Sequence, residues 1–106
     1  MSDNKRIHVV DTTLRDGSHA VSHKFTTAQV AAIAGGMDEA GIEYIELSHG
    51  DGLAGSSYNY GWSACNEEEL LKAASKVIKK GKLTVLLIPG IGTVEDLKTA
   101  AACGAK

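Results

Sequence analysis

The apolar residues of this chain form short continuous runs that alternate with stripes of helical spacing. Three runs, at residues 7–11, 44–47 and 83–88, are almost uninterrupted, as is typical of strands buried on both faces of a parallel sheet. Between them, apolar positions recur every three or four residues, the spacing of a helix that buries one face. The pattern predicts the order βαβαβα, with a long loop at residues 12–25.

Capping residues mark the ends of the first two helices. Thr26 and Gln29 match a capping box at the start of the first helix, and Gly41 stands where a left-handed residue would end it. Asn66 precedes three glutamates at the start of the second helix, where acidic side chains favour the helix dipole. We expect this second helix to end at Gly81.

The loops that follow the strands are long, whereas the returns from helix to strand are short. Right-handed crossovers between parallel strands place all the long loops at one end of the sheet, where function concentrates. With a third helix over residues 93–104, residues 1–106 are expected to be the first three units of a TIM (β/α)8 barrel. Three strands leave two unpaired edges, so we expect an incomplete domain or a piece that associates, rather than an independent three-layer domain.

Composition and charge exclude several classes of protein. The chain has 106 residues, 43% of them hydrophobic and 23% charged, and a formal net charge of −2, so we expect neither nucleic-acid nor membrane-surface binding. No apolar run approaches the roughly 20 residues of a membrane span, and residues 1–6 are polar, unlike a signal peptide. The two cysteines are isolated, which predicts free thiols in the cytoplasm.

The residues best suited to chemistry follow the first strand. Arg15, Asp16 and His19 lie within five residues, where a strand end would present them to a ligand. Asp16 is a hard oxygen ligand for Mg²⁺ or Mn²⁺, and the guanidinium of Arg15 can hold a carboxylate or an enolate oxygen. His19 can exchange protons near neutral pH. The alternative is an ordinary surface pair of Arg15 and Asp16 with a solvated His19.

The glycine-rich loop at residues 49–61 gives a weaker signal. Its glycines permit close approach of the backbone, and His49 and Asp51 are candidate ligands or hydrogen-bond partners. Its spacing is not that of a dinucleotide fingerprint. Three aromatic residues are expected to pack this loop onto the rim of the barrel: Tyr58, Tyr60 and Trp62.

Three other features are interpreted as structural. The turn at residues 89–92 precedes a helix N-terminus, so it is either an anion site or, more simply, a tight turn. His8 is expected inside the first strand, and His23 lies just before the first helix. Neither histidine is assigned a chemical role.

The segment Asp11-Thr-Thr-Leu-Arg-Asp-Gly17 resembles the first-strand signature of the pyruvate-handling, metal-dependent barrel family. That family includes hydroxymethylglutaryl-CoA lyase, isopropylmalate synthase and the 4-hydroxy-2-oxovalerate aldolases. The synthases usually continue with Glu-Gln, whereas Ser18-His-Ala20 is similar to the aldolase branch. Three further segments agree with that branch: Ser48-His-Gly-Asp-Gly52, Ser56-Ser-Tyr-Asn-Tyr-Gly61 and Leu87-Ile-Pro-Gly-Ile-Gly-Thr93. The resemblance spans the whole chain but only the first part of the family's length.

The resemblance implies roles for three residues. Asp16 would be a carboxylate ligand of a divalent metal, typically Mn²⁺, with Mg²⁺ or Co²⁺ as alternatives. Arg15 would bind the small 2-keto acid and stabilise the pyruvate enolate, and His19 would be the general base. The implied reaction is retro-aldol cleavage of 4-hydroxy-2-oxopentanoate to pyruvate and acetaldehyde, in the catabolism of aromatic compounds. The implied partner is an acylating acetaldehyde dehydrogenase that receives the aldehyde.

The sequence departs from the family in one respect. The family's other metal ligands are a His-x-His pair on a later strand, and this sequence contains no His-x-His. We therefore expect the 106-residue chain to be inactive alone. Two alternatives stay open. One is a fragment of an acyl-CoA-using synthase or lyase of the same family, and the other is a non-catalytic piece that associates with itself through an exposed sheet edge.

Overall fold

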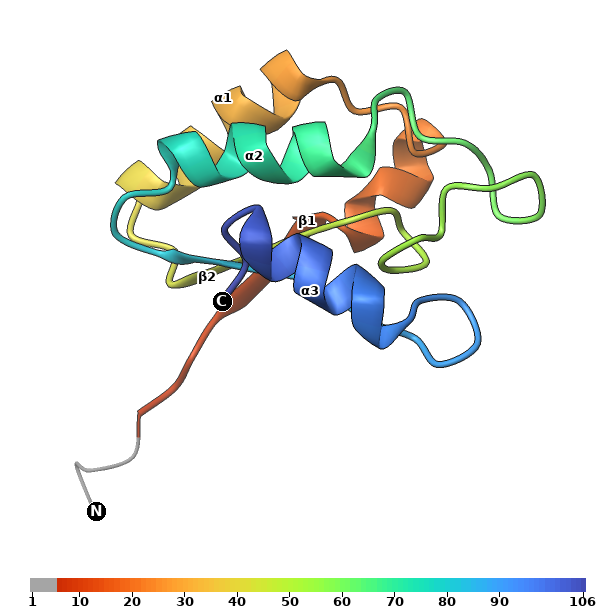
Figure 1. Ribbon diagram of the computed structural model, residues 1–106. Coiled ribbons are helices and arrows are strands. Elements are labelled where there is room, and N and C mark those ends of the chain that lie inside the picture. Colours follow the sequence, from red (N-terminus) through yellow and green to blue (C-terminus); the bar gives the residue numbers. More distant parts are fainter. Residues whose placement is uncertain (1–5) are drawn as a thin grey trace.

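The computed structural model describes residues 6–106, in which helices pack against a three-stranded parallel sheet (Figure 1). The strands are β1 (Val10–Leu14), β2 (Tyr44–Leu47) and β3 (Lys82–Thr84), in the order β1-β2-β3. The helices are α1 (Thr27–Glu39), α2 (Glu67–Val77) and α3 (Val94–Ala102), and a short 3-10 helix, η1 (Asp16–Val21), follows β1. The predicted βαβαβα order is confirmed.

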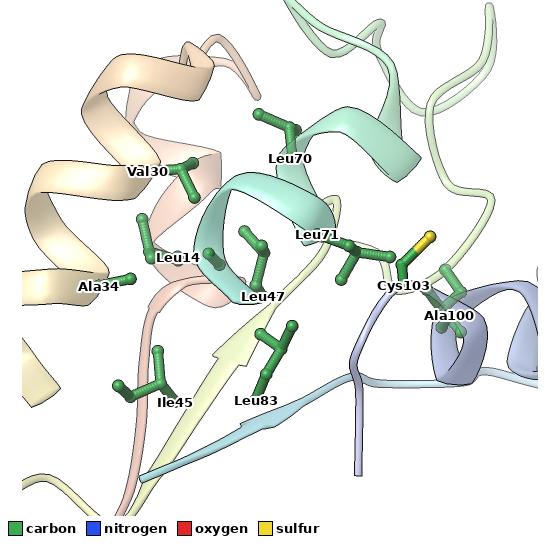
Figure 2. Packing of buried hydrophobic residues seen from close by; sticks show 12 residues of the cluster. Leu14, Val30, Ala34, Ile45, Leu47, Leu70, Leu71, Leu83, Ala100 and Cys103 are labelled. Carbon is green, nitrogen blue, oxygen red and sulfur yellow. The ribbon is translucent and has the colours of Figure 1, made fainter. Parts of the chain in front are cut away.

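One buried cluster joins the sheet to its helices (Figure 2). Helices α1 and α2 lie side by side over the sheet, and α3 contacts α2 (Figure 1). The strands contribute leucines and an isoleucine, and the helices contribute smaller apolar side chains and two further leucines. Burying one leucine side chain is worth about 2 kcal/mol, so this cluster fixes the helices on the sheet.

The predicted helix starts are confirmed by hydrogen bonds. Thr26 Oγ1 accepts from the N–H of Gln29 at 3.2 Å, and the Gln29 side chain accepts from the N–H of Thr26 at 2.9 Å, which completes the capping box. Asn66 caps α2 by accepting from the N–H of Glu68 at 2.9 Å. Gly41 follows α1 with a φ of 89°, as its predicted place requires.

The first strand begins later in the chain than predicted. Ile7 and Val9 precede it and are exposed, because no element among residues 6–106 packs over them. The strand instead covers the residues that pair with β2, Val10–Leu14. His8, expected inside the strand, lies ahead of it. The predicted loop at residues 12–25 therefore contains the end of β1 and all of η1.

Helix α2 ends at Val77 rather than at Gly81. The reason is the buried carboxylate of Asp38 in α1, which accepts hydrogen bonds from the backbone N–H groups of Lys79, Lys80 and Gly81 at 2.8, 3.0 and 2.7 Å. These bonds hold the segment in a turn instead of a further helical turn. The same contacts connect α1 to the start of β3.

The third strand is shorter than the predicted run at residues 83–88. Its pairing with β2 ends at Thr84, opposite Glu46, because β2 stops one residue later. Beyond that point the carbonyl oxygen of Leu86 accepts a hydrogen bond from the N–H of Leu53 at 2.8 Å instead. Residues 1–5 of the predicted polar tail lie outside the described residues. Within residues 6–106, the helices are all too short or too polar to cross a membrane.

Candidate functional site

The predicted site residues lie at the carboxyl ends of β1 and β2. Arg15 follows β1 directly, and Asp16 and His19 belong to η1. The loop after β2 begins with Ser48 and approaches the same place, because its Gly50 packs against the ring of His19. Two loops far apart in the sequence thus meet at one end of the sheet, where open parallel sheets and barrels bind ligands.

An irregularity in β1 sets the direction of Arg15. The register with β2 runs from Asp11 opposite Ile45 to Leu14 opposite Leu47, so β1 uses one more residue than its partner and forms a bulge. The carboxylate of Asp11 accepts from the N–H of Thr13 at 2.8 Å, which stabilises this local bend. Bulges of this kind re-aim side chains next to functional sites.

Arg15 connects the two strand ends. Its Nε donates to Oε1 of Glu46 at 2.5 Å, and its Nη1 donates to the carbonyl oxygen of Gly50 at 3.2 Å. The side chains of Arg15 and Glu46 are only 20% and 14% exposed, so water screens this charge-assisted pair weakly. Glu46 and Gly50 therefore hold Arg15 in place, and the pair with Asp16, at 3.5 Å, is secondary.

Asp16 is the accessible carboxylate of this site, with its side chain 67% exposed. Its contact with Arg15 is loose, which leaves oxygen lone pairs for another partner. Hard divalent ions such as Mn²⁺ and Mg²⁺ take oxygen ligands of this kind. Asp16 therefore fits the part of one metal ligand, although one carboxylate is not a complete coordination shell.

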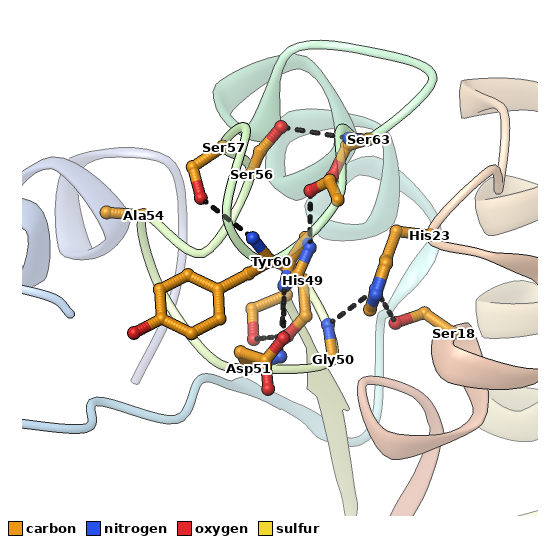
Figure 3. A network of polar contacts seen from close by, with 12 residues as sticks. Ser18, His23, His49, Gly50, Asp51, Ala54, Ser56, Ser57, Tyr60 and Ser63 are labelled. Carbon is orange, nitrogen blue, oxygen red and sulfur yellow. Dashed lines mark hydrogen bonds and ion pairs between the residues drawn. The ribbon is translucent and has the colours of Figure 1, made fainter.

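Three histidines, His19, His23 and His49, form a stack next to Gly50, and Figure 3 shows its two inner rings, His23 and His49. The rings of His23 and His49 are nearly parallel, with their centroids 3.6 Å apart, and the ring of His19 meets His23 edge-on at 4.9 Å. His49 is buried, His23 is half-buried and His19 is exposed. The stack therefore leads outward from the core, with the predicted general base at its accessible end.

Backbone hydrogen bonds fix the protons on the two inner rings. Nδ1 of His49 accepts from the N–H of Asp51 at 3.0 Å, and its Nε2 donates to the carbonyl oxygen of Gly61 at 2.8 Å. Nδ1 of His23 accepts from the N–H of Gly50 at 3.2 Å. A ring nitrogen that accepts a hydrogen bond carries no proton, so both rings are neutral and protonated at Nε2.

The surroundings lower the pKa of His23. Partial burial is the largest cause, because it disfavours the charged imidazolium. The neighbouring His49 and His19, when protonated, and Lys24 act in the same direction by charge repulsion, and Asp51 opposes them. The shift agrees with the neutral ring that the hydrogen bond from Gly50 requires.

His19, His23 and Asp51 also lie close enough together to share a metal ion, since one potential ligand atom from each lies within 4.8 Å of the others. Coordination through Nε2 of His23 would require its proton to move to Nδ1, which would break the bond from Gly50. The competing partner of Asp16 is Arg15, at 3.5 Å. Among residues 6–106, Asp16 and this cluster are therefore both candidate metal ligands.

The loop at residues 49–61 does not pack through its aromatic residues, contrary to expectation. Tyr58, Tyr60 and Trp62 are 89%, 47% and 58% exposed within the described part of the chain. Polar contacts hold the loop instead. Nε2 of His49 donates to the carbonyl oxygen of Gly61, and Nζ of Lys24 donates to the carbonyl oxygen of Trp62 at 2.6 Å. Within this loop, His49 rather than the exposed aromatic rings contacts the other histidines of the site.

The remaining features agree with their simpler interpretations. The turn at residues 89–92 is a tight turn in which the N–H groups of Ile91 and Gly92 both donate to the carbonyl oxygen of Ile88, at 3.0 and 3.1 Å. Cys65 and Cys103 are both free thiols.

Two residues of the site were missed from the sequence. Glu46 had a signal, because it is a charged residue inside the apolar run of β2, and such residues seldom lie there without a partner. His23 was interpreted as structural, and nothing local to it indicated that a loop 27 residues later would meet its ring.

The HMGL-like protein family matches residues 6–106 of the chain. Over 102 residues the chain is 79% identical to a protein of Moorella thermoacetica named 4-hydroxy-2-oxovalerate aldolase, and 62% identical to one of the same name from Carboxydothermus hydrogenoformans. Each alignment covers 96% of this chain and 30% of the relative. A relative of that name in Geobacillus thermodenitrificans is 53% identical over 106 residues. The chain therefore spans about 30% of the length of these relatives.

Proposed function

The chain belongs to the HMGL-like family, and from this premise we propose that it is the N-terminal part of a metal-dependent aldolase barrel. The complete barrel, meaning this chain continued to the length of its relatives, cleaves 4-hydroxy-2-oxopentanoate to pyruvate and acetaldehyde. The observation that carries the proposal is the meeting of Arg15, Asp16 and His19 at the ends of β1 and β2. The names of the relatives support the aldolase branch.

Arg15 binds the anionic end of the substrate. Glu46 accepts from its Nε and Gly50 accepts from its Nη1, and the remaining N–H groups are free to hold a carboxylate or a developing enolate oxygen. Because these two contacts fix the plane before substrate arrives, little reorganisation is needed as negative charge develops. Arg15 thus serves both binding and stabilisation of the enolate.

His19 acts as the general base. It lies at the exposed end of the histidine stack, where a substrate hydroxyl can reach it. It removes the proton of the C4 hydroxyl while the C3–C4 bond breaks, and this yields the aldehyde and the enolate of pyruvate. The neutral rings of His23 and His49 behind it place no fixed charge against the imidazolium that forms.

Asp16 would hold the divalent ion, for which we propose Mn²⁺, with Mg²⁺ or Co²⁺ as alternatives. When bound, the ion acts as a Lewis acid that polarises the keto acid and favours the enolate. The family's His-x-His pair, which this sequence does not contain, would supply the other ligands. For that reason we propose that the 106-residue chain is inactive alone.

We also propose that the complete barrel works in the cytoplasm beside an acylating acetaldehyde dehydrogenase, which would receive the volatile aldehyde. The free thiols of Cys65 and Cys103 support a reducing compartment. The proposed partner rests on the resemblance to the aldolase branch. Transfer of acetaldehyde to the dehydrogenase without release to solvent would support this assignment.

Release of pyruvate by the complete barrel tests the proposed function. With Mn²⁺ and 4-hydroxy-2-oxopentanoate, we expect pyruvate and acetaldehyde in equal amounts and no requirement for an acyl-CoA. Dependence on an acyl-CoA would instead favour the synthase and lyase branch of the family. The 106-residue chain should release no pyruvate under the same conditions.

A second candidate, a non-catalytic piece that associates with itself, is favoured by the edge of β1. Among residues 6–106, β1 pairs only with β2, and Val10 at its start is half exposed. An unpaired edge can pair with a second copy. Sedimentation of the 106-residue chain distinguishes the two, because a stable monomer would argue against association through this edge.

A further inference from the structure

His23 holds both ends of the loop that follows β2. At the start of the loop, its Nδ1 accepts the N–H of Gly50 at 3.2 Å, as Figure 3 shows. At the far end, its own carbonyl oxygen accepts the N–H of Ala64 at 3.1 Å. The face of its ring packs on His49, which in turn bonds Gly61. His23 therefore contacts the loop through its ring nitrogen, its carbonyl oxygen and the face of its ring.

The loop start held in this way contacts both proposed catalytic residues. The carbonyl oxygen of Gly50 accepts from Nη1 of Arg15 at 3.2 Å. On its other side, a Cβ at position 50 would lie 2.6 Å from Nε2 of His19 and 2.7 Å from Cε1 of His23, so the rings lie directly on the bare glycine. The position of this one residue is therefore coupled to Arg15, His19 and His23 together.

The backbone at His23 is strained in a way that this arrangement explains. Ser22 and His23 have φ values of 50° and 61°, in the left-handed region that side-chain-bearing residues seldom occupy. The N–H of His23 donates to the carbonyl oxygen of Ser18 at 2.7 Å, and its Nδ1 lies 3.2 Å from the Ser18 hydroxyl. Such strain persists only where surrounding contacts require it, and it clusters at functional sites.

We propose that His23 is a positioning residue of the aldolase site, which clamps the loop after β2 and so holds Gly50 against Arg15 and His19. The proposal rests on the proposed function, because it assigns His23 a role relative to those two residues. His23 acts as a neutral hydrogen-bond acceptor rather than as a metal ligand or a proton donor. The lowered pKa described above supports a ring that stays neutral.

Two variants separate the hydrogen bond from the folding of the chain. His23→Gly removes the ring and also relieves the left-handed backbone, so loss of fold is not its expected effect. His23→Asn keeps an acceptor near the position of Nδ1 and tolerates the left-handed conformation. His8→Gly is the matched control, because it removes a histidine ahead of β1 that bonds Glu43 instead.

The kinetics of the complete barrel with Mn²⁺ give the first readout. A small misplacement of catalytic groups costs about a hundredfold in rate, so we expect His23→Gly to lower kcat by about that factor. His23→Asn should restore most of the loss, and His8→Gly should behave as the wild type. Wild-type kcat in His23→Gly would overturn the proposal, as would failure of His23→Asn to recover activity.

Two measurements on the same proteins do not depend on turnover. Imidazole ¹⁵N spectra should show His23 unprotonated at Nδ1 and protonated at Nε2. The amides of Gly50 and Ala64 should exchange slowly in the wild type, in His23→Asn and in His8→Gly, and faster in His23→Gly. An Nδ1–H tautomer, or unchanged amide protection in His23→Gly, would overturn the proposal. An inactive wild type would refute only the proposed function. The tautomer of His23 and the exchange of the Gly50 and Ala64 amides would then still support or overturn the clamp.

Discussion

Nε of Arg15 donates to the carboxylate of Glu46 at 2.5 Å, across the ends of the neighbouring strands β1 and β2. Both side chains are largely shielded from water, and the bond fixes the plane of a guanidinium that the carbonyl oxygen of Gly50 holds from the other side. This ion pair connects the end of β1 to β2. It also gives a charged residue in an apolar strand a physical reason to be there.

Glu46→Gln is expected to weaken the binding of substrate and the stabilisation of the enolate. The amide keeps its size but loses the charge that holds Arg15, and one charge-assisted hydrogen bond is worth about 1.5–3 kcal/mol. We therefore expect kcat/KM of the complete barrel to fall by about 10- to 100-fold, measured as pyruvate release. Glu95→Gln, which removes an exposed partner of Lys98 on α3, is the control. An unchanged kcat/KM in Glu46→Gln would show that Glu46 does not position Arg15.

Asp38 is expected to make the stability of the fold depend on acid. Hydrogen bonds from the backbone of Gly81 and Lys79, then Lys80, hold its pKa below the ordinary value of about 4. A carboxyl group with a lowered folded-state pKa contributes stability above its unfolded pKa, and that contribution disappears as the pH falls through the folded-state value. The urea concentration at the midpoint of unfolding should therefore decrease as the pH is lowered below about 4.

Asp38→Asn supplies the comparison for this pH dependence. The amide cannot accept from all three backbone groups as an anion does, so its urea midpoint at pH 7 should be lower than that of the wild type. The drop in acid should also be smaller in the variant. Parallel pH curves for the two proteins would contradict the assigned role of Asp38.

Glu67, at the start of α2, is expected to act in the opposite direction. Burial raises its pKa, with a further contribution from Asp96, and its Oε2 has no hydrogen-bond partner while Oε1 accepts from the N–H of Ala54 at 3.1 Å. A group with a raised folded-state pKa binds its proton more tightly in the folded state, which stabilises the fold. For Glu67 this contribution is complete below the unfolded pKa of about 4.3 and is lost as the pH rises through the folded-state pKa.

Glu67→Gln should therefore stabilise the fold at pH 7 by about 1 kcal/mol, because the amide keeps an acceptor for Ala54 without a buried charge. Urea unfolding at pH 4 and pH 7 measures the change. The gain should vanish near pH 4, where the glutamate is protonated. Glu68→Gln, on the exposed side of the same first turn, serves as the control. A variant less stable than wild type at pH 7 would mean that the charge of Glu67 is favourable.

The order of the elements and the local caps were predictable from the sequence, whereas the exact ends of elements that depend on distant segments were not. The caps at Thr26 and Asn66 involve residues two or three positions apart, so the sequence contains the whole interaction. The start of β1 depends on pairing with β2, and the end of α2 depends on the carboxylate of Asp38 in another helix. Neither partner can be identified from the segment itself.

The candidate site shows the same division. Arg15, Asp16 and His19 were found because they are neighbours in the sequence and follow a strand. Glu46 and His23 act on them through contacts between distant segments: Glu46 on Arg15 directly, and His23 on the loop after β2. Hydrophobic spacing predicts which segments meet, but it does not determine which polar side chains face each other once they have met.

Pyruvate release by His19→Asn in the complete barrel, with saturating Mn²⁺, tests the central claim most directly. If His19 is the general base at the ends of β1 and β2, its kcat should fall by about 10²–10⁴-fold, while Mn²⁺ affinity, measured by titration, stays close to that of the wild type. The matched variant His8→Asn should keep wild-type kcat. Wild-type turnover in His19→Asn would contradict the account.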